Sequence, residues 1–544
     1  MSIDAPTPSD HNPTTGHELP RSELTARSED TSERDRPAAE HMLHLEHTDP
    51  EHTQNTTSET ADSARPPTAT ARMIFVEETA FSDQLLDSDD SADINDKLPR
   101  GPDPTAGDTP AAERPGDTDT AATAPATVDH AQDAGPVDAA HQRERAVDAV
   151  CTRHGVETAE GRAAVAQAYD VVRDWHAPFV VRHTLDVIAD CKADIAANPG
   201  TVVVFLGRDG HAPALAAYHL DREFFDEHCT EVTVSRRLAD TTVQDLERNA
   251  GKTFPQLEGF RTARHEVDPV DIPGAKAQMT RYLESRGVPV GTPGARIVLV
   301  DSSFKGTVQE LLSATYPHAE FRGRYLMYAE SPDDPHPGSK TGYALHHPAD
   351  ATRDPNDLAQ FFLEKDAVLA IEQILRGPWS KAVRFGPDDV PIQTLEPPAR
   401  DQINPLDIAP EYLEENVRLA VMDINQHAVA DYAESIAAVR RDGGDWRGEL
   451  IDKSEAFMRE VRSWVTGDRD TDPAFAQLLG SFVRREDKHI VADLNTALTQ
   501  RGLDTADTTP VWQNYRQLGS IDEKRAYLEQ IRSHSTPSTG ADHG

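Results

Sequence analysis

The chain contains 544 residues, of which 94 are Asp or Glu and 54 are Lys or Arg, so its formal net charge is −40. This excess of negative charge argues against a general affinity for nucleic acid or anionic membranes, because phosphate-rich surfaces bind clustered cations. The cysteines Cys151, Cys191 and Cys229 are scattered without a CxxC pair, which argues against a disulfide framework or a cysteine-built zinc site.

Targeting signals are not visible in the sequence. The N-terminus has no basic start followed by an apolar stretch, so we expect no secretory signal. No apolar run approaches the roughly 20 residues that span a bilayer. A cytoplasmic location is therefore expected, with no membrane and no nucleic acid as partner.

Composition and periodicity divide the chain into six expected segments. The N-terminal segment, 1–141, is poor in aliphatic and aromatic residues and cannot bury enough apolar surface to offset its ordering entropy. The segments are a disordered acidic tail (1–141), a helical lead-in (142–200), an α/β phosphate-ligand domain (201–385), a Pro-rich linker (386–410), a helical region (411–533) and a second disordered tail (534–544).

An apolar island interrupts the first tail at residues 73–86. It could be a short element that folds against a protein partner, or the apolar residues could cluster there by chance. The sequence supports a partner-binding element and chance clustering about equally.

Short apolar, mostly β-branched runs predict four strands, at residues 201–206, 231–234, 296–300 and 324–328. Helical spacing recurs between them. Strands that alternate with helices predict an α/β fold with a parallel, doubly wound, Rossmann-like sheet.

Polar residues follow three of these strands, at 207–210, 235–237 and 301–307. Ligands of open parallel sheets bind beyond the carboxyl ends of the strands, so the three segments are expected to converge. Arginine and lysine could neutralise phosphate, glycine lets backbone N–H groups approach an anion, and hydroxyls add donors. The candidate phosphate-binding residues are Gly207, Arg208, Gly210, Ser235, Arg236, Arg237, Ser302, Ser303, Lys305, Gly306 and Thr307.

Asp209 and Asp301 are the candidate catalytic and metal-binding residues. Their carboxylates could hold Mg²⁺, bind ribose hydroxyls or act as a general base. The structural alternatives are that Asp301 caps the following helix and that Arg208 and Asp209 form a local ion pair. The coincidence of three such segments favours a ligand site over these alternatives.

Residues 200–440 resemble a module that follows haloacid-dehalogenase-like hydrolase domains in bacterial surface-polysaccharide proteins. That module has an apolar strand ending in RDG, a later SRR, a D-x-x-[WF]-x-G-[TS]-x-Q stretch, and a Glu-containing helix before a turn. The matching residues here are 205–210, 235–237, 301–309, and Glu372 with 377–380. The hydrolase half with its DxDx[TV] loop is not visible, which weighs against phosphatase activity.

A more distant resemblance is to type I phosphoribosyltransferases. Residues 204–220 resemble their pyrophosphate loop and helix, and residues 296–307 resemble the strand and loop that hold the ribose 5-phosphate. This resemblance implies a phosphoribosyltransferase-like fold. The loop departs from the family pattern because Ser302 replaces the second of two adjacent acids and the loop is shorter.

The favoured hypothesis is a transferase that acts on a nucleotide, phosphoribosyl or phosphosugar substrate with Mg²⁺, so its partner is a phosphorylated small molecule. Catalysis would consist mainly of positioning and charge neutralisation. One alternative is a haloacid-dehalogenase-related phosphoester hydrolase that uses Asp209 or Asp301. The other is a non-catalytic, nucleotide-sensing interaction protein that recruits partners through its N-terminal tail and its helical region.

Overall fold

The computed structural model describes residues 139–302, 304–354 and 356–533. Most of the expected N-terminal tail, the apolar island at 73–86, the expected tail at 534–544 and the candidate Ser303 lie outside the described residues. None of the described helices combines the length and apolar character that crossing a membrane requires.

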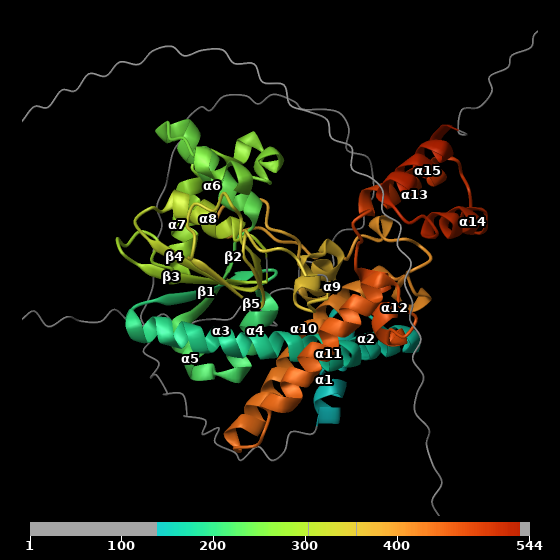
Figure 1. Ribbon diagram of the computed structural model, residues 1–544, viewed down its shortest axis with the longest axis horizontal. Coiled ribbons are helices and arrows are strands. Elements are labelled where there is room, and N and C mark those ends of the chain that lie inside the picture. Colours follow the sequence, from blue (N-terminus) through green and yellow to red (C-terminus); the bar gives the residue numbers. More distant parts are fainter. Residues whose placement is uncertain (1–138, 303, 355, 534–544) are drawn as a thin grey trace, which may run out of the picture. The chain divides into compact units, whose positions relative to one another are not determined.

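The described residues contain a five-stranded sheet in the order β2-β1-β3-β4-β5, in which every neighbouring pair is parallel (Figure 1). This arrangement confirms the predicted α/β fold class. The strands are β1 (Val202–Gly207), β2 (Cys229–Thr233), β3 (Arg296–Asp301), β4 (Glu320–Ala329) and β5 (Lys340–His347).

Strand β5 is not among the four strands that the sequence predicts. Its residues KTGYALHH contain a glycine and polar groups instead of a continuous β-branched run, as an edge strand tolerates. The chain also returns from β4 to β5 through residues 330–339, which is fewer than the dozen or more residues usual between parallel strands and includes no helix.

Helices cover both faces of the sheet. Val204 and Leu206 of β1 pack toward α6, α7 and α8, whereas Val203 and Phe205 pack toward α3, α4 and α5 (Figure 1). The flanking helices are α3 (Ala177–Ala197), α4 (His211–Leu220), α5 (Arg222–His228), α6 (Arg236–Ala250), α7 (Ala275–Ser285) and α8 (Thr307–Thr315).

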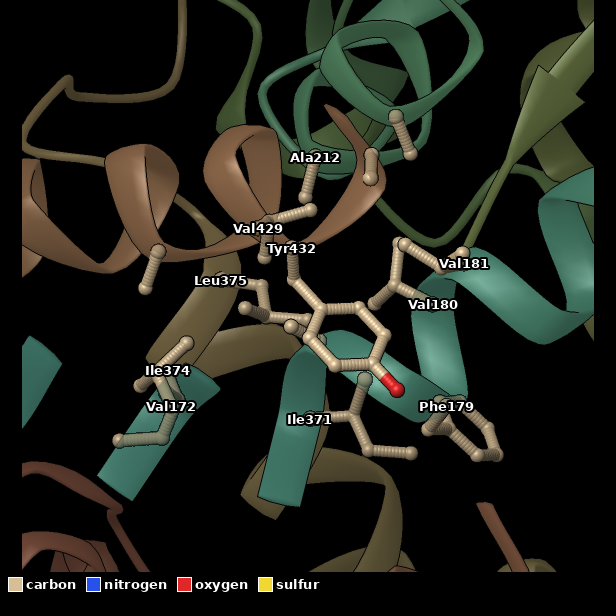
Figure 2. Close-up of a cluster of buried hydrophobic side chains, with 14 of the residues drawn as sticks. Val172, Phe179, Val180, Val181, Ala212, Ile371, Ile374, Leu375, Val429 and Tyr432 are labelled. Carbon is tan, nitrogen blue, oxygen red and sulfur yellow. The ribbon is translucent and has the colours of Figure 1, made fainter. Parts of the chain in front are cut away.

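A second group of helices continues the core on the α4 side of the sheet. Figure 2 shows Tyr432 of α10 and Ile371 of α9 packed with Phe179 and Val180 of α3. The helices of this group are α1 (Ala139–Arg153), α2 (Ala159–Val171), α9 (Lys365–Leu375), α10 (Glu415–Arg441), α11 (Arg447–Thr466) and α12 (Pro473–Phe482). The predicted helical C-terminal region is therefore present, and α10 packs against α4 of the α/β domain.

Three further helices close the described chain around their own small core, which includes Leu494, Trp512 and Leu528. They are α13 (Lys488–Gln500), α14 (Thr505–Arg516) and α15 (Ile521–Ser533).

The strand order places a topological switch beside β1. The chain leaves β1 for β2 on one side and later returns to β3 on the other, so the loops that follow β1 and β3 diverge. Such a divergence opens a crevice beyond the carboxyl ends of the two strands, where open α/β sheets bind ligands.

Candidate functional site

A cavity of about 770 Å³ lies at the carboxyl ends of β1, β2 and β3. The structure brings to its lining most of the residues that the sequence analysis selected. They are Gly207, Arg208, Asp209, Ser235, Arg236, Arg237, Asp301, Lys305, Gly306 and Thr307. Gly210 and Ser302 do not line the cavity, and Ser303 lies outside the described residues.

The loop after β1 turns directly into α4. The backbone N–H of Gly210 donates to the Leu206 carbonyl at 2.7 Å, and a Cβ at position 210 would lie 2.5 Å from that oxygen. The loop therefore requires glycine at position 210 for close packing, not for contact with a ligand. The peptide bond between Gly207 and Arg208 is cis.

Arg208 and Asp209 form the local ion pair that the sequence left open as an alternative. The Nε of Arg208 lies 2.9 Å from Oδ1 of Asp209, and both side chains are about one quarter exposed. Both also line the cavity, so the ion pair does not remove either group from a ligand's reach.

Ser235 begins α6 as its N-cap. Its hydroxyl accepts a hydrogen bond from Leu238 N at 3.1 Å and donates one to the Ala382 carbonyl at 2.6 Å. The following Arg236 is exposed, and within the described part of the chain it has no carboxylate within 4.0 Å. Arg237 has one at 4.0 Å, on Asp271.

Asp301, the last residue of β3, lines the cavity. Its Oδ1 accepts the backbone N–H of Ser302 at 2.7 Å. Burial raises the pKa of Asp301 well above its usual range, and the charges of Asp209 and Glu372 raise it further, while Arg236 opposes them. Ser302 is buried and its hydroxyl lies 3.4 Å from Oε1 of Glu372.

Lys305 and Gly306 complete the loop after β3. Lys305 is exposed, and no carboxylate among the described residues lies within 4.0 Å of it. Gly306 has a φ of +70° as the N-cap of α8, and a Cβ there would lie 2.6 Å from Cε of Lys340. Glycine is therefore needed here both for the backbone conformation and for space.

The far wall of the cavity comes from α9, the segment after it, and the junction of α12 and α13, and none of these segments was predicted from residue spacing to line a site. Glu372 was named only because of the family resemblance. The spacing of the other residues of this wall does not indicate a site. The charged members of this wall are Lys365, Glu372, Arg376, Lys381, Glu396, Arg484 and Lys488.

The lining is electropositive in a strongly acidic protein. It includes nine Lys or Arg residues and five Asp or Glu residues. Four of the five acids are Asp209, Asp301, Glu372 and Glu396, and the fifth is Glu266. An imbalance of this kind concentrates anions in the cavity.

Hard oxygen donors that suit Mg²⁺ are present, but they do not form a complete cage. In the described ranges, no three His, Cys, Asp or Glu residues are arranged to hold a metal ion by themselves. The charges of Asp209 and Glu372 both act on Asp301, so these carboxylates lie near one another, as a site completed by substrate phosphate would require.

Fold and site together define a parallel α/β protein with a cationic, carboxylate-centred cavity at its topological switch point. No family model matches the chain. No curated protein matches it either.

Proposed function

We propose that the chain is an enzyme that binds a phosphorylated small molecule in this cavity and transfers a group to or from it. The observation that supports the proposal most is the position of Arg236 and Lys305, cations without a carboxylate partner in the described chain, beside Asp209 and Asp301. Cations that lack a carboxylate partner at the carboxyl edge of a parallel sheet are available to bind phosphate oxygens.

The substrate class that we propose is a nucleotide, a phosphoribosyl compound or a phosphosugar. Arg236, Arg237 and Lys305 would neutralise the phosphate. Asp209 and Asp301 would bind sugar hydroxyls or Mg²⁺, and the ion would neutralise phosphate charge that develops during transfer. The resemblance to type I phosphoribosyltransferases supports this class, although Ser302 stands where that family has a second acid.

Two other functions receive less support. A phosphoester hydrolase with Asp301 as nucleophile needs an ionised carboxylate, whereas burial and the neighbouring acids raise the pKa of Asp301 and favour its neutral form. A nucleotide-sensing protein without activity would use the same cavity. It differs from an enzyme in keeping its partner when Asp209 or Asp301 is replaced.

The surroundings of the protein are also part of the proposal. We place it in the cytoplasm, with a small molecule and neither nucleic acid nor membrane as its ligand. The segment at residues 1–141 is proposed to recruit a protein partner.

A thermal-shift screen of nucleotides and sugar phosphates, with and without Mg²⁺, tests the proposal. A ligand at 100 times its Kd stabilises the native state by about 2.7 kcal/mol, so the melting temperature rises. The double variant Arg236→Gln/Lys305→Gln should lose this shift, whereas Lys453→Gln/Arg459→Gln on the exposed face of α11 should keep it.

The same ligands then separate the functions. Asp209→Asn and Asp301→Asn should abolish turnover while circular dichroism reports an intact fold. If no compound shifts the melting temperature, or if Arg236→Gln/Lys305→Gln responds like the unchanged protein, the cavity does not have the proposed role.

A further inference from the structure

Three of the cations on the far wall lie far in sequence from the phosphate loops, which are the segments 207–210, 235–237 and 301–307. Arg376 follows the last residue of α9, Arg484 follows α12, and Lys488 is the first residue of α13. All three line the same cavity as Arg236 and Lys305. Arg376 is buried, and Arg484 and Lys488 are half-buried.

These cations repel one another. Burial and the charges of Arg208 and Arg484 together lower the pKa of Arg376 to about 10, against the opposing charge of Glu396. Burial and Arg208 likewise lower the pKa of Arg484. The pKa of Lys488 falls through burial, Arg484 and two more lysines. Guanidinium and ammonium groups crowded in this way are stabilised when an anion joins them.

Carboxylates make few close contacts with these three cations in the described part of the chain. Arg484 donates at 2.9 Å to Gln402 and at 3.4 Å to Gln373, both uncharged amides. The nearest carboxylate to Arg376 is that of Glu396, 3.9 Å away, on a half-exposed side chain. Lys488 has no carboxylate within 4.0 Å in the part of the chain that the structure describes.

Both groups of cations lie in one cavity with the acids. The charges of Asp209 and Glu372 raise the pKa of Asp301, and Arg236 opposes them. The charge of Arg208 lowers the pKa of Arg376 and of Arg484, and Arg484 also lowers that of Arg376. The far wall thus adds cations to the same cavity that the loops after β1, β2 and β3 line.

We propose that Arg376, Arg484 and Lys488 form a second anion subsite, and that the ligand carries a second phosphate group. The inference rests on the proposed function, in which the first phosphate binds at Arg236 and Lys305. Three cations match a phosphate dianion better than a single carboxylate, and guanidinium groups pair with phosphate oxygens through parallel hydrogen bonds. A cavity of about 770 Å³ has the size of a small-molecule pocket.

The test compares ribose 5-phosphate with ribose 1,5-bisphosphate, which differ by one phosphate group, using calorimetry on the full chain with Mg²⁺ present. The unchanged protein should bind the bisphosphate at least about tenfold more tightly, because charge-assisted hydrogen bonds to the second phosphate add to its affinity. In Arg484→Gln/Lys488→Gln the preference for the bisphosphate should shrink to about twofold, because the second phosphate keeps only Arg376 of its three partners.

Two further variants keep this result interpretable. Replacing Arg484 removes its hydrogen bonds to Gln373 and Gln402, which could disturb the fold. Lys365→Gln/Lys488→Gln replaces only lysines that have no carboxylate partner among the described residues, so this variant should fold. It should reduce the preference for the bisphosphate in part. Lys453→Gln/Arg459→Gln on α11 should leave the difference unchanged.

The outcomes are distinct. An undiminished preference for the bisphosphate in Arg484→Gln/Lys488→Gln, or equal affinities in the unchanged protein, overturns the second subsite and leaves the first intact. Equal weakening of both sugars also overturns it, because a separate subsite contacts only the second phosphate. If neither sugar binds the unchanged protein, the proposed phosphosugar function fails, and the inference fails with it.

Discussion

Asp301 sits at the end of β3 in surroundings that oppose its charge. Burial and two neighbouring carboxylates raise its pKa, whereas the Ser302 N–H at 2.7 Å and the charge of Arg236 stabilise the ionised form. Groups held in this way cluster at functional sites, where stability is sacrificed for chemistry. At the scale of single residues, a cationic ligand group or a metal ion would reduce the free-energy cost of ionising Asp301.

Asp301→Asn should therefore stabilise the ligand-free protein while abolishing binding or turnover. Because the folded-state pKa is raised, the stability associated with protonated Asp301 is fully present below its ordinary pKa of 3.8 and is lost as the pH rises through the raised value. Asparagine cannot ionise, and its side-chain oxygen can still accept from Ser302. The variant should gain on the order of 1 kcal/mol at neutral pH and little near pH 4.

Denaturant melts of both proteins at several pH values, in the presence of a metal chelator, measure this gain. Asp470→Asn on an exposed loop is the matched control and should show no such trend. A variant that is less stable than the unchanged protein at neutral pH would contradict the assignment.

Gly210→Ala tests the packing behind the phosphate loop. The new Cβ would lie 2.5 Å from the Leu206 carbonyl oxygen, a backbone atom that cannot turn aside. We expect a loss of about 1–3 kcal/mol in the free energy of unfolding, measured by urea melts. Gly448→Ala in α11 meets nothing within 4 Å and should be neutral or stabilising, so a similar loss there would point to a different cause.

At the scale of elements, the loop from β3 to α8 rests on a buried ion cluster. Lys340 of β5 pairs with Glu310 of α8 and, at 2.7 Å, with Asp334, and the side chains of Lys340 and Glu310 are fully buried. Because Cε of Lys340 lies under Gly306, the cluster also fixes the floor of the phosphate loop. The edge strand β5 thus contributes to the site from outside it.

Lys340→Met should destabilise the protein strongly, because it leaves the buried Asp334 without its cation and leaves Glu310 with only the His336 imidazole, 2.6 Å away. The expected loss is about 3–5 kcal/mol, measured by chemical denaturation. Lys192→Met removes an exposed ion pair to Asp221 and should cost about 1 kcal/mol or less. If the two losses were equal, the buried cluster would have no special part in stability.

At the scale of the whole molecule, the helical region completes the cavity of the α/β domain. Buried Asn425 and Gln426 of α10 donate to the carbonyls of Ile374 and Leu375 at 2.9 and 2.6 Å. These carbonyls close α9, where an α-helix leaves its last acceptors unpaired. Helix α10 thereby fixes the end of α9 next to Arg376.

Asn425→Leu should loosen this connection. The Ile374 carbonyl would lose its donor, at a cost of about 1–3 kcal/mol in the free energy of unfolding. Ligand affinity should fall as well, because α9 carries Glu372 and Arg376. Asn495→Leu breaks a more exposed hydrogen bond to the Asp401 carbonyl and serves as the control. Unchanged stability of Asn425→Leu in calorimetric melts would show that α9 is held by packing alone.

The sequence predicted the parallel α/β class and four of the five strands, and most of the candidate site residues line one cavity. The β-branched runs of β1 and β3 are local signals, and their helical spacers identify a parallel sheet. Strand β5 was not predicted, because its residues lack that signal. The hydroxyl of Ser235 was expected to face phosphate, yet it is engaged in capping α6 and in a bond to Ala382, partners that sequence spacing does not reveal.

The sequence by itself determined that loops rich in Arg, Gly and Asp follow parallel strands, because strand pattern and strand polarity are local properties and parallel strands end at one edge. Only the tertiary structure decided that Arg376, Arg484 and Lys488 face those loops. Their place depends on how α9 packs against α10 and on where α12 ends, and long-range packing of this kind leaves no periodicity in the residues that it brings together.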